Sequence, residues 1–383
     1  MRNYEPRMGA RDMVGHALIL AGLRSLDQRR SDCVETFAEE RDTCRERGKV
    51  REERGVVERG AKFTEPAASG AERGFVVGVD IGGTKTALLA TDVVSGENLA
   101  QSRIPTPAGE GPEALIDRLM EAIDTIAAEA GRDVADLAAL GVAVPGQVDA
   151  ETGRVIQAGN LTGWTDRSPR DLVRERRDLP VWVDQDANAA VLGERWRGGA
   201  KAMHNVVFLA LGTGIGAGLI VNGRLHRGYH HAAGEVGNFL MGREFLGQER
   251  DGHGNLELLI GGPAIRAAAK VATGESLSAA GALAQAEDDP RLAVLAERVA
   301  DYLAIVVLNI TALLDPEAIF WGGGTASAGD AFLDRVRECV ARESPVVPSL
   351  LRSELGEDAQ LHGAVFGALW ELDPDLALRE ELR

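Results

Sequence analysis

The residues best suited to chemistry are a carboxylate and two glycines that follow an apolar run. Residues 76–81 are mostly β-branched, which favours a strand, and Asp80 lies near the end of that run. Paired glycines let backbone N–H groups approach an anion without an intervening Cβ, and Asp80 could contact Mg²⁺ or its water shell. The candidate phosphate-binding residues here are Gly82, Gly83, Thr84 and Lys85. An ordinary hairpin turn has a similar composition, so this motif alone leaves both interpretations open.

Two more glycine clusters follow apolar runs downstream. Residues 206–211 and 318–321 each have the pattern of a buried strand, and each run ends in glycines. The candidate phosphate- or nucleotide-binding residues in these clusters are Gly212, Thr213, Gly214, Gly322, Gly323 and Gly324. Either cluster could be turn chemistry alone. In this order, the three clusters resemble the nucleotide clamp of the actin, Hsp70 and sugar kinase superfamily, which implies that the chain binds ATP.

Four further segments resemble successive motifs of one family in that superfamily. They are Pro145–Asp149, Asn160–Trp164, Asp184–Ala190 and Gly234–Gly237. As a set they resemble the ROK family of repressors and sugar kinases, particularly its bacterial glucokinases, and the likeness covers roughly residues 75–370. The resemblance implies an α/β fold of two ribonuclease-H-like (actin-like ATPase) domains with a cleft between them.

Asp186 is the candidate catalytic base. Phosphoryl transfer needs positioning, charge neutralisation by Mg²⁺ and one carboxylate that accepts the proton of the attacking hydroxyl. Asp186 follows the apolar run 180–183 and precedes a helix of small residues, so we expect it to point into the cleft. An isolated aspartate at this place would be interpreted as the N-cap of the helix, whereas the family motif favours the base. Its neighbour Asp184 is interpreted as structural.

The resemblance also implies a set of sugar contacts, which are Asn160, Gln185, Glu235, Asn238 and Glu257. A buried polar site is selective because it rejects ligands that leave its groups unpaired. Glu235 and Glu257 could instead be surface carboxylates, since long acidic side chains are mostly exposed. Gln185 replaces the asparagine that is usual at its place in the glucokinases. The longer amide leaves the identity of the sugar open.

The zinc motif that is common in ROK kinases is missing. The place of its histidine and the places of its three cysteines are taken by Asn238, Gln248, Arg250 and Asn255. Because every ligand is replaced, we expect no zinc site and a loop held by ordinary packing. Three histidines nearby could in principle bind a metal, namely His230, His231 and His253. No cysteine accompanies them, so we interpret them as surface or sugar-edge residues.

Charge and composition argue against several other classes of protein. The formal net charge of the 383 residues is −17, and such a surface repels nucleic acid and membrane phosphates. Aromatic residues make up 4% of the chain, too few for a platform on which single-stranded nucleic acid could stack. No apolar run is long enough to predict a transmembrane helix. The three widely spaced cysteines fit a reducing, cytoplasmic compartment.

The chain is expected to contain an extension and two domains. Residues 1–72 carry 14 basic and 14 acidic residues and almost no apolar face, so we expect poor order there; a start codon assigned too far upstream is the other explanation. Alternating strands and helices then predict an N-terminal α/β domain at 73–187 and a C-terminal α/β domain at 188–357. A helix at 358–383 is expected to pack back on the first domain.

The predicted function is an ATP- and Mg²⁺-dependent kinase for the 6-hydroxyl of glucose, a glycolytic enzyme that acts on a small-molecule sugar as a homodimer or homotetramer. Alternatives within the class are a kinase for another hexose or an N-acetylhexosamine, and a polyphosphate-using glucokinase, for which a basic groove would be needed. In a different class, a sugar-responsive ROK repressor would need a DNA-binding winged helix in residues 1–72. Those residues lack a clear helix-turn-helix. A catalytically inactive sugar-binding module is disfavoured because Asp186 and the phosphate turns are present.

Overall fold

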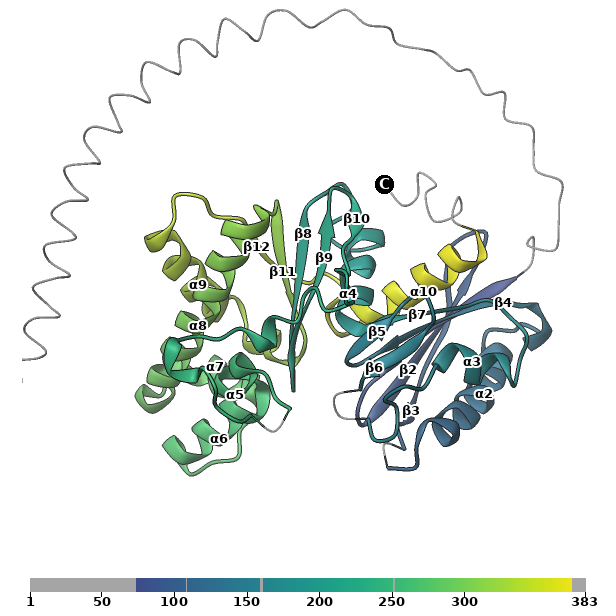
Figure 1. Ribbon diagram of the computed structural model, residues 1–383, viewed down its shortest axis with the longest axis horizontal. Coiled ribbons are helices and arrows are strands. Elements are labelled where there is room, and N and C mark those ends of the chain that lie inside the picture. Colours follow the sequence, from purple (N-terminus) through teal and green to yellow (C-terminus); the bar gives the residue numbers. More distant parts are fainter. Residues whose placement is uncertain (1–73, 108, 159–160, 251, 374–383) are drawn as a thin grey trace, which may run out of the picture. The chain divides into compact units, whose positions relative to one another are not determined.

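The computed structural model describes residues 74–107, 109–158, 161–250 and 252–373. The predicted extension and the candidate sugar contact Asn160 lie outside the described residues. Within these ranges the chain forms two five-stranded sheets, a two-stranded hairpin and covering helices, which confirms the predicted α/β class (Figure 1). None of the helices in these ranges is long and apolar enough to cross a membrane.

The first sheet has the strand order β3-β2-β1-β4-β7. Its strands are β1 (Phe75–Ile81), β2 (Lys85–Asp92), β3 (Asn98–Pro105), β4 (Leu137–Val144) and β7 (Val181–Gln185). Strand β1 pairs antiparallel with β2 and parallel with β4, and β4 pairs parallel with β7. Asp80 is level with Ala143 on β4, which is level with Asp184 on β7. The carboxyl ends of three strands therefore meet at the sheet edge where the predicted catalytic residues begin.

Helix α2 (Pro112–Glu129) covers one face of this sheet. Its apolar residues recur at helical spacing and are buried, namely Leu115, Ile116, Leu119, Ile123 and Ile126. A hairpin of β5 (Gln147–Asp149) and β6 (Arg154–Gln157) and the short helix α3 (Pro169–Arg174) complete this half. The hairpin was not predicted, because strands of three and four residues are too short for an alternating pattern to be recognised.

The second sheet has the order β10-β9-β8-β11-β12 and repeats the pairing of the first. Its strands are β8 (Val206–Leu211), β9 (Ile215–Val221), β10 (Arg224–Leu225), β11 (Ala318–Gly322) and β12 (Ser349–Arg352). Strands β8 and β9 form an antiparallel hairpin, and β8, β11 and β12 run parallel. In both sheets, a glycine turn joins the two strands of the central antiparallel hairpin.

The helices of this second half are α5 (Asn255–Ile260), α6 (Gly262–Thr273), α7 (Ala279–Ala284), α8 (Pro290–Leu314) and α9 (Asp330–Glu343). Residues 262–284 therefore form two helices, α6 and α7. Gly274 ends α6 in the left-handed conformation at φ 83°, which is a common helix terminus. Ser278 then caps α7 through a hydrogen bond from the Gly281 N–H.

Two helices connect the halves of the described chain. Helix α4 (Asp186–Trp196) contacts β8 and β9, and α10 (Ala359–Leu372) packs on α4 and on β1 and β4. Figure 1 shows α10, in yellow, alongside the first sheet. The approach requires glycine: a Cβ added at Gly363 would overlap the Ala189 carbonyl oxygen of α4, and one at Gly141 would overlap that of Ala364. This packing fixes α4, whose first residue is Asp186; the domain boundaries given above remain predictions.

Candidate active site

Asp186 is the first residue of α4 and directly follows β7. The N-cap residue is Gln185, so capping does not explain the aspartate. Asp186 Oδ1 accepts a hydrogen bond from the Ala187 N–H at 2.7 Å. Burial raises the pKa of Asp186, the Ala187 hydrogen bond lowers it and the charge of Glu235 raises it, so that the pKa is about 6. A carboxylate with this pKa is ionised at neutral pH and can still accept a proton.

Asp80 is a second carboxylate at the same sheet edge. Burial, followed by the charge of Asp186, raises the pKa of Asp80 to about 7; the charge of Lys85 lowers it and that of Asp358 raises it. Asp80 and Asp186 therefore repel each other when both are ionised. A bound divalent cation would relieve this repulsion, so the burial and charge of Asp80 fit its predicted role toward Mg²⁺.

The first glycine turn is tight and faces outward. The Gly82 N–H donates to the Lys85 carbonyl oxygen at 2.9 Å, and Gly83, Thr84 and Lys85 are exposed. Lys85 Nζ lies 3.3 Å from Glu357 Oε2. Both groups are well exposed, and such surface pairs contribute little energy. The lysine therefore remains able to exchange this partner for a phosphate.

The second glycine turn is held in place by Glu257. The turn closes through a hydrogen bond from the Gly212 N–H to the Gly214 carbonyl oxygen at 3.0 Å, and Thr213 and Gly214 are exposed. Glu257 Oε1 accepts the Ile215 N–H at 2.9 Å, and its Oε2 accepts the Gly254 N–H at 3.1 Å. Both oxygens of this predicted sugar contact thus bind the main chain beside the turn, and its contact with sugar remains a prediction.

The third glycine cluster lies against the second turn. Gly322 on β11 pairs with Ala210 on β8. Gly323 adopts φ +86°, and an added Cβ there would be 2.6 Å from the Leu211 carbonyl oxygen. At Gly324 an added Cβ would meet nothing within 4 Å. Two glycine-rich segments from distant parts of the sequence therefore meet beside open space, as a nucleotide site requires.

The predicted sugar contacts Gln185 and Glu235 bind each other. Gln185 Nε2 donates to Glu235 Oε1 at 2.8 Å. Burial raises the pKa of Glu235, the Gln185 hydrogen bond lowers it, and the charge of Glu257 raises it. Asn238 is exposed, and its main-chain N–H donates to the Glu235 carbonyl oxygen at 3.1 Å. The structure thus gathers Gln185, Asp186 and Glu235 around one strand end, with Asn238 at the margin.

Two of the residues at the zinc-motif places hydrogen-bond the main chain through their side chains, whereas Arg250 Nη1 is buried without a hydrogen-bond partner. Gln248 Nε2 donates to the Glu244 carbonyl oxygen at 2.8 Å, and the buried Asn255 accepts the Met241 N–H at 2.9 Å through Oδ1. Within the described ranges, no group of three or more His, Cys, Asp or Glu side chains is arranged to hold a metal. His231 Nε2 is instead 3.5 Å from Asp149 Oδ1.

Three residues that influence this site were missed from the sequence. Glu357 pairs with Lys85, and the charge of Asp358 acts on Asp80; both lie just before α10, so their role depends on α10 packing against the first sheet. Arg227 pairs with Asp184, 43 residues away in the chain. No local pattern marks such distant pairs.

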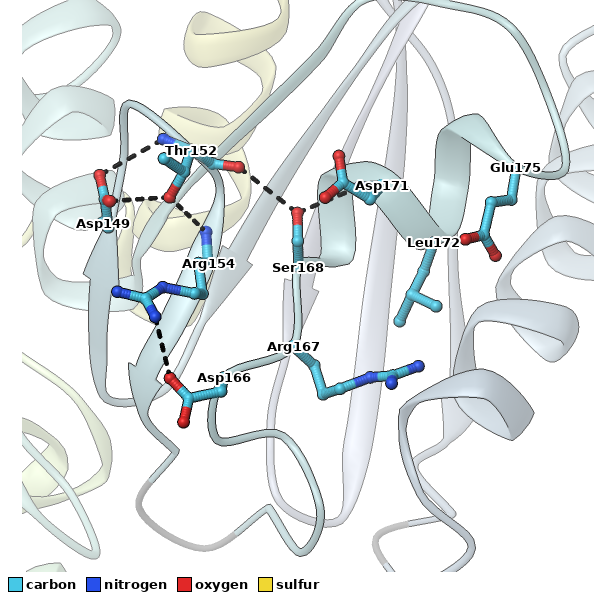
Figure 2. Close-up of a pocket in the computed structure, with 9 residues that line it drawn as sticks. All are labelled: Asp149, Thr152, Arg154, Asp166, Arg167, Ser168, Asp171, Leu172 and Glu175. Carbon is cyan, nitrogen blue, oxygen red and sulfur yellow. Dashed lines mark hydrogen bonds and ion pairs between the residues drawn. The ribbon is translucent and has the colours of Figure 1, made fainter.

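A cavity of about 400 Å³ lies beside the β5–β6 hairpin and α3. Its lining residues are Asp149, Thr152, Arg154, Asp166, Arg167, Ser168, Asp171, Leu172 and Glu175. Figure 2 shows the Arg154 side chain directed at Asp166 and the Asp149 carboxylate bonded to Thr152. Among the predicted site residues that the structure describes, none lines this cavity, which is therefore distinct from the cluster of Gln185, Asp186 and Glu235.

Two sheets of like strand order, each with a glycine turn in its central hairpin, define the class of actin-like ATPase folds. Residues 76–370 match the ROK family, and the chain belongs to that family. A solved ROK family glucokinase from Streptomyces griseus, in complex with glucose and AMPPNP, is similar at a TM-score of 0.66 and 29% identity, with 77% of this chain and 99% of that chain covered. The predicted family and fold are confirmed.

Two curated relatives are glucokinases. The chain is 32% identical over 283 residues to the glucokinase of Halalkalibacterium halodurans, covering 69% of this chain and 84% of the relative. It is 31% identical over 314 residues to the glucokinase of Streptomyces coelicolor, covering 76% of this chain and 96% of that relative. In both cases the similarity spans most of the relative.

Proposed function

We propose that this chain is a glucokinase that transfers the γ-phosphoryl group of ATP to the 6-hydroxyl of glucose. The observation that carries the proposal is the position of Asp186, with a pKa of about 6, at the helix end next to the Gln185–Glu235 pair. A base and a hydrogen-bonding pair for hydroxyls lie together there. The glucokinase relatives support the same assignment.

In the proposed reaction, Asp186 binds the attacking hydroxyl and takes its proton. The hydroxyl oxygen forms a bond to the γ-phosphorus while the bond between that phosphorus and the leaving oxygen of ADP breaks. Gln185 and Glu235 hold the other hydroxyls, so the 6-hydroxyl is presented to Asp186 in one orientation. Such positioning is the main contribution of protein groups to phosphoryl transfer.

The three glycine segments would bind the nucleotide. Gly82–Lys85 and Gly212–Gly214 would cradle phosphates with backbone N–H groups, and Gly322–Gly324 would let the base and ribose approach the main chain. Asp80 would hold Mg²⁺ directly or through water. When bound, Mg²⁺ neutralises charge on the transferring phosphates.

Two finer properties belong to the same proposal. The three widely spaced cysteines support a cytoplasmic protein, and phosphorylation of glucose would make it a glycolytic enzyme. Family resemblance supports a homodimer or homotetramer.

Another hexose or an N-acetylhexosamine is the alternative substrate, because Gln185 is longer than the usual asparagine. The repressor alternative depends on residues 1–72 and would require sequence-specific DNA binding.

The test is ADP release by the full chain with a panel of sugars. We expect glucose to give the highest kcat/KM among glucose, mannose, N-acetylglucosamine and N-acetylmannosamine. 6-Deoxyglucose lacks the accepting hydroxyl, so it should compete with glucose and form no sugar phosphate. Higher kcat/KM with an N-acetylhexosamine would support the alternative substrate, and no phosphorylation of any sugar would contradict the proposal.

A further inference from the structure

Asp184 is a buried carboxylate with a full set of donors around it. Its side chain is 1% exposed and lies at the end of β7, two residues before Asp186. Oδ1 accepts the Gln185 N–H at 2.8 Å and Asn188 Nδ2 at 2.9 Å. One oxygen therefore bonds the residues on both sides of Asp186.

The other oxygen binds an arginine from the second half of the chain. Arg227 Nε and one terminal nitrogen lie 2.7 Å and 2.6 Å from Asp184 Oδ2. Arg227 begins a loop that closes on itself, since the Ala233 N–H donates to the Arg227 carbonyl oxygen at 3.0 Å. Glu235 lies two residues after Ala233. Arg227 thus holds the start of the segment that carries Glu235.

The end of the same segment is held by the next residue of β7. Gln185 Nε2 donates to Glu235 Oε1 at 2.8 Å. Adjacent residues at one strand end therefore bind both ends of the segment 227–235. This places the candidate sugar-binding loop relative to the candidate base.

Only a carboxylate satisfies the surroundings of residue 184. Its partners are a backbone N–H, an amide nitrogen and a guanidinium, all of them donors. An asparagine would direct its own N–H₂ group at one of these donors in either orientation. It would also leave the Arg227 charge without its partner.

We propose that Asp184 and Arg227 form a positioning pair that sets the distance between Asp186 and the loop carrying Glu235, and so controls how the sugar hydroxyl meets the base. The inference rests on the proposed sugar kinase function. Neither residue needs to touch sugar. Breaking the pair should move the loop, and a displacement of about 1 Å in such a site can cost about 100-fold in rate.

The test compares four variants in the full chain. Arg227→Gln removes the charge, and Arg227→Lys keeps the charge but replaces the planar fork by one ammonium group. Arg224→Gln is the matched control, since Arg224 is an exposed arginine on β10 whose side chain forms no hydrogen bond or ion pair with the described residues. Val306→Ala shortens a fully buried side chain in α8 and shows what lower stability alone does.

We expect Arg227→Gln to lower kcat/KM for glucose about 100-fold through both a higher KM and a lower kcat, and Arg227→Lys to lower it about tenfold. Arg224→Gln and Val306→Ala, assayed well below their thermal midpoints, should remain within twofold of the parent. Should Arg227→Gln be insoluble, Arg227→Lys carries the comparison. Parent-like kcat and KM in every soluble Arg227 variant would overturn the proposal, as would an equal loss in Val306→Ala.

Amide hydrogen exchange separates this proposal from the proposed function, because it requires no turnover. In the Arg227 variants, exchange should increase at residues 184–188 and 227–235 and stay unchanged in α2 and α8. Unchanged exchange at residues 184–188 and 227–235 would refute the positioning pair even if the chain is a kinase. Absence of sugar phosphorylation by the parent, with the exchange pattern as expected, would refute the function and leave the pair supported.

Discussion

Asp80→Asn should stabilise the ligand-free protein at neutral pH. The pKa of Asp80 is raised from 3.8 to about 7 by burial and by Asp186, so ionising this group is harder in the folded chain than in the unfolded one. The shift corresponds to at most roughly 4 kcal/mol at pH above 7. The charges of Asp80 and Asp186 act on each other. Removing the charge of Asp80 should therefore raise the free energy of unfolding by about 1–3 kcal/mol.

The sign of the effect fixes its pH dependence. Below pH 3.8 the Asp80 carboxyl is protonated in both the folded and the unfolded chain, so it does not lower the free energy of unfolding. As pH rises from 3.8 to about 7 the unfolded chain releases its proton first, so wild-type stability falls across this window. The advantage of Asp80→Asn should therefore be absent near pH 4 and complete near pH 7.5.

The assay is urea unfolding followed by circular dichroism between pH 4 and 8, in the presence of a chelator. Asp178→Asn is the matched control, because Asp178 is exposed; its unfolding free energy should follow that of the parent. Added Mg²⁺ and ATP should then stabilise the parent more than Asp80→Asn, since ligands that bind only the folded state stabilise it. The reasoning would be refuted if Asp80→Asn were no more stable than the parent at pH 7.5. It would also be refuted if the stability advantage of Asp80→Asn at pH 4 were as large as that at pH 7.5.

Three further predictions follow from the same structure. With Mg²⁺ in excess, kcat/KM should fall about tenfold per pH unit below pH 6, because Asp186 has a pKa of about 6 and must be ionised to act; a flat profile between pH 5 and 7 would contradict this. Gly363→Ala should lower the free energy of urea unfolding by about 1–3 kcal/mol, because the added methyl group overlaps the Ala189 carbonyl oxygen. The control Gly252→Ala should lower it less. Gly252 is exposed and faces open space, although its φ is +79°. Active protein should contain far less than one zinc per chain by elemental analysis, and near-stoichiometric zinc would show that His230, His231 or His253 forms a substitute site.

The glycine turns and their strands could be predicted from the sequence because each is encoded locally. A run of β-branched residues ending in glycines predicts strand and turn within about ten residues, and the structure has hairpins at both Gly82 and Gly212. The hairpin at Gln147 was missed because its strands are too short to show a period. The break between α6 and α7 cannot be predicted from Gly274 alone, because one glycine does not always end a helix.

The contacts of the site could not be predicted in the same way. Family resemblance predicts Glu257 as a sugar contact, but it does not reveal that both of its oxygens also accept main-chain N–H groups. The pair of Asp184 with Arg227 depends on β7 meeting a loop from the other half of the chain. Such pairs are set by the packing of whole elements, and they leave no period or spacing in the sequence.

The central claim is that Asp186 accepts the proton of the sugar hydroxyl, and turnover by Asp186→Asn tests it most directly. The amide is nearly isosteric and can still hydrogen-bond the hydroxyl, but it cannot take the proton. We expect kcat for glucose phosphorylation to fall about 10²–10⁴-fold, while glucose binding measured by calorimetry changes little. Turnover within a few-fold of the parent, with glucose bound normally, would contradict the account.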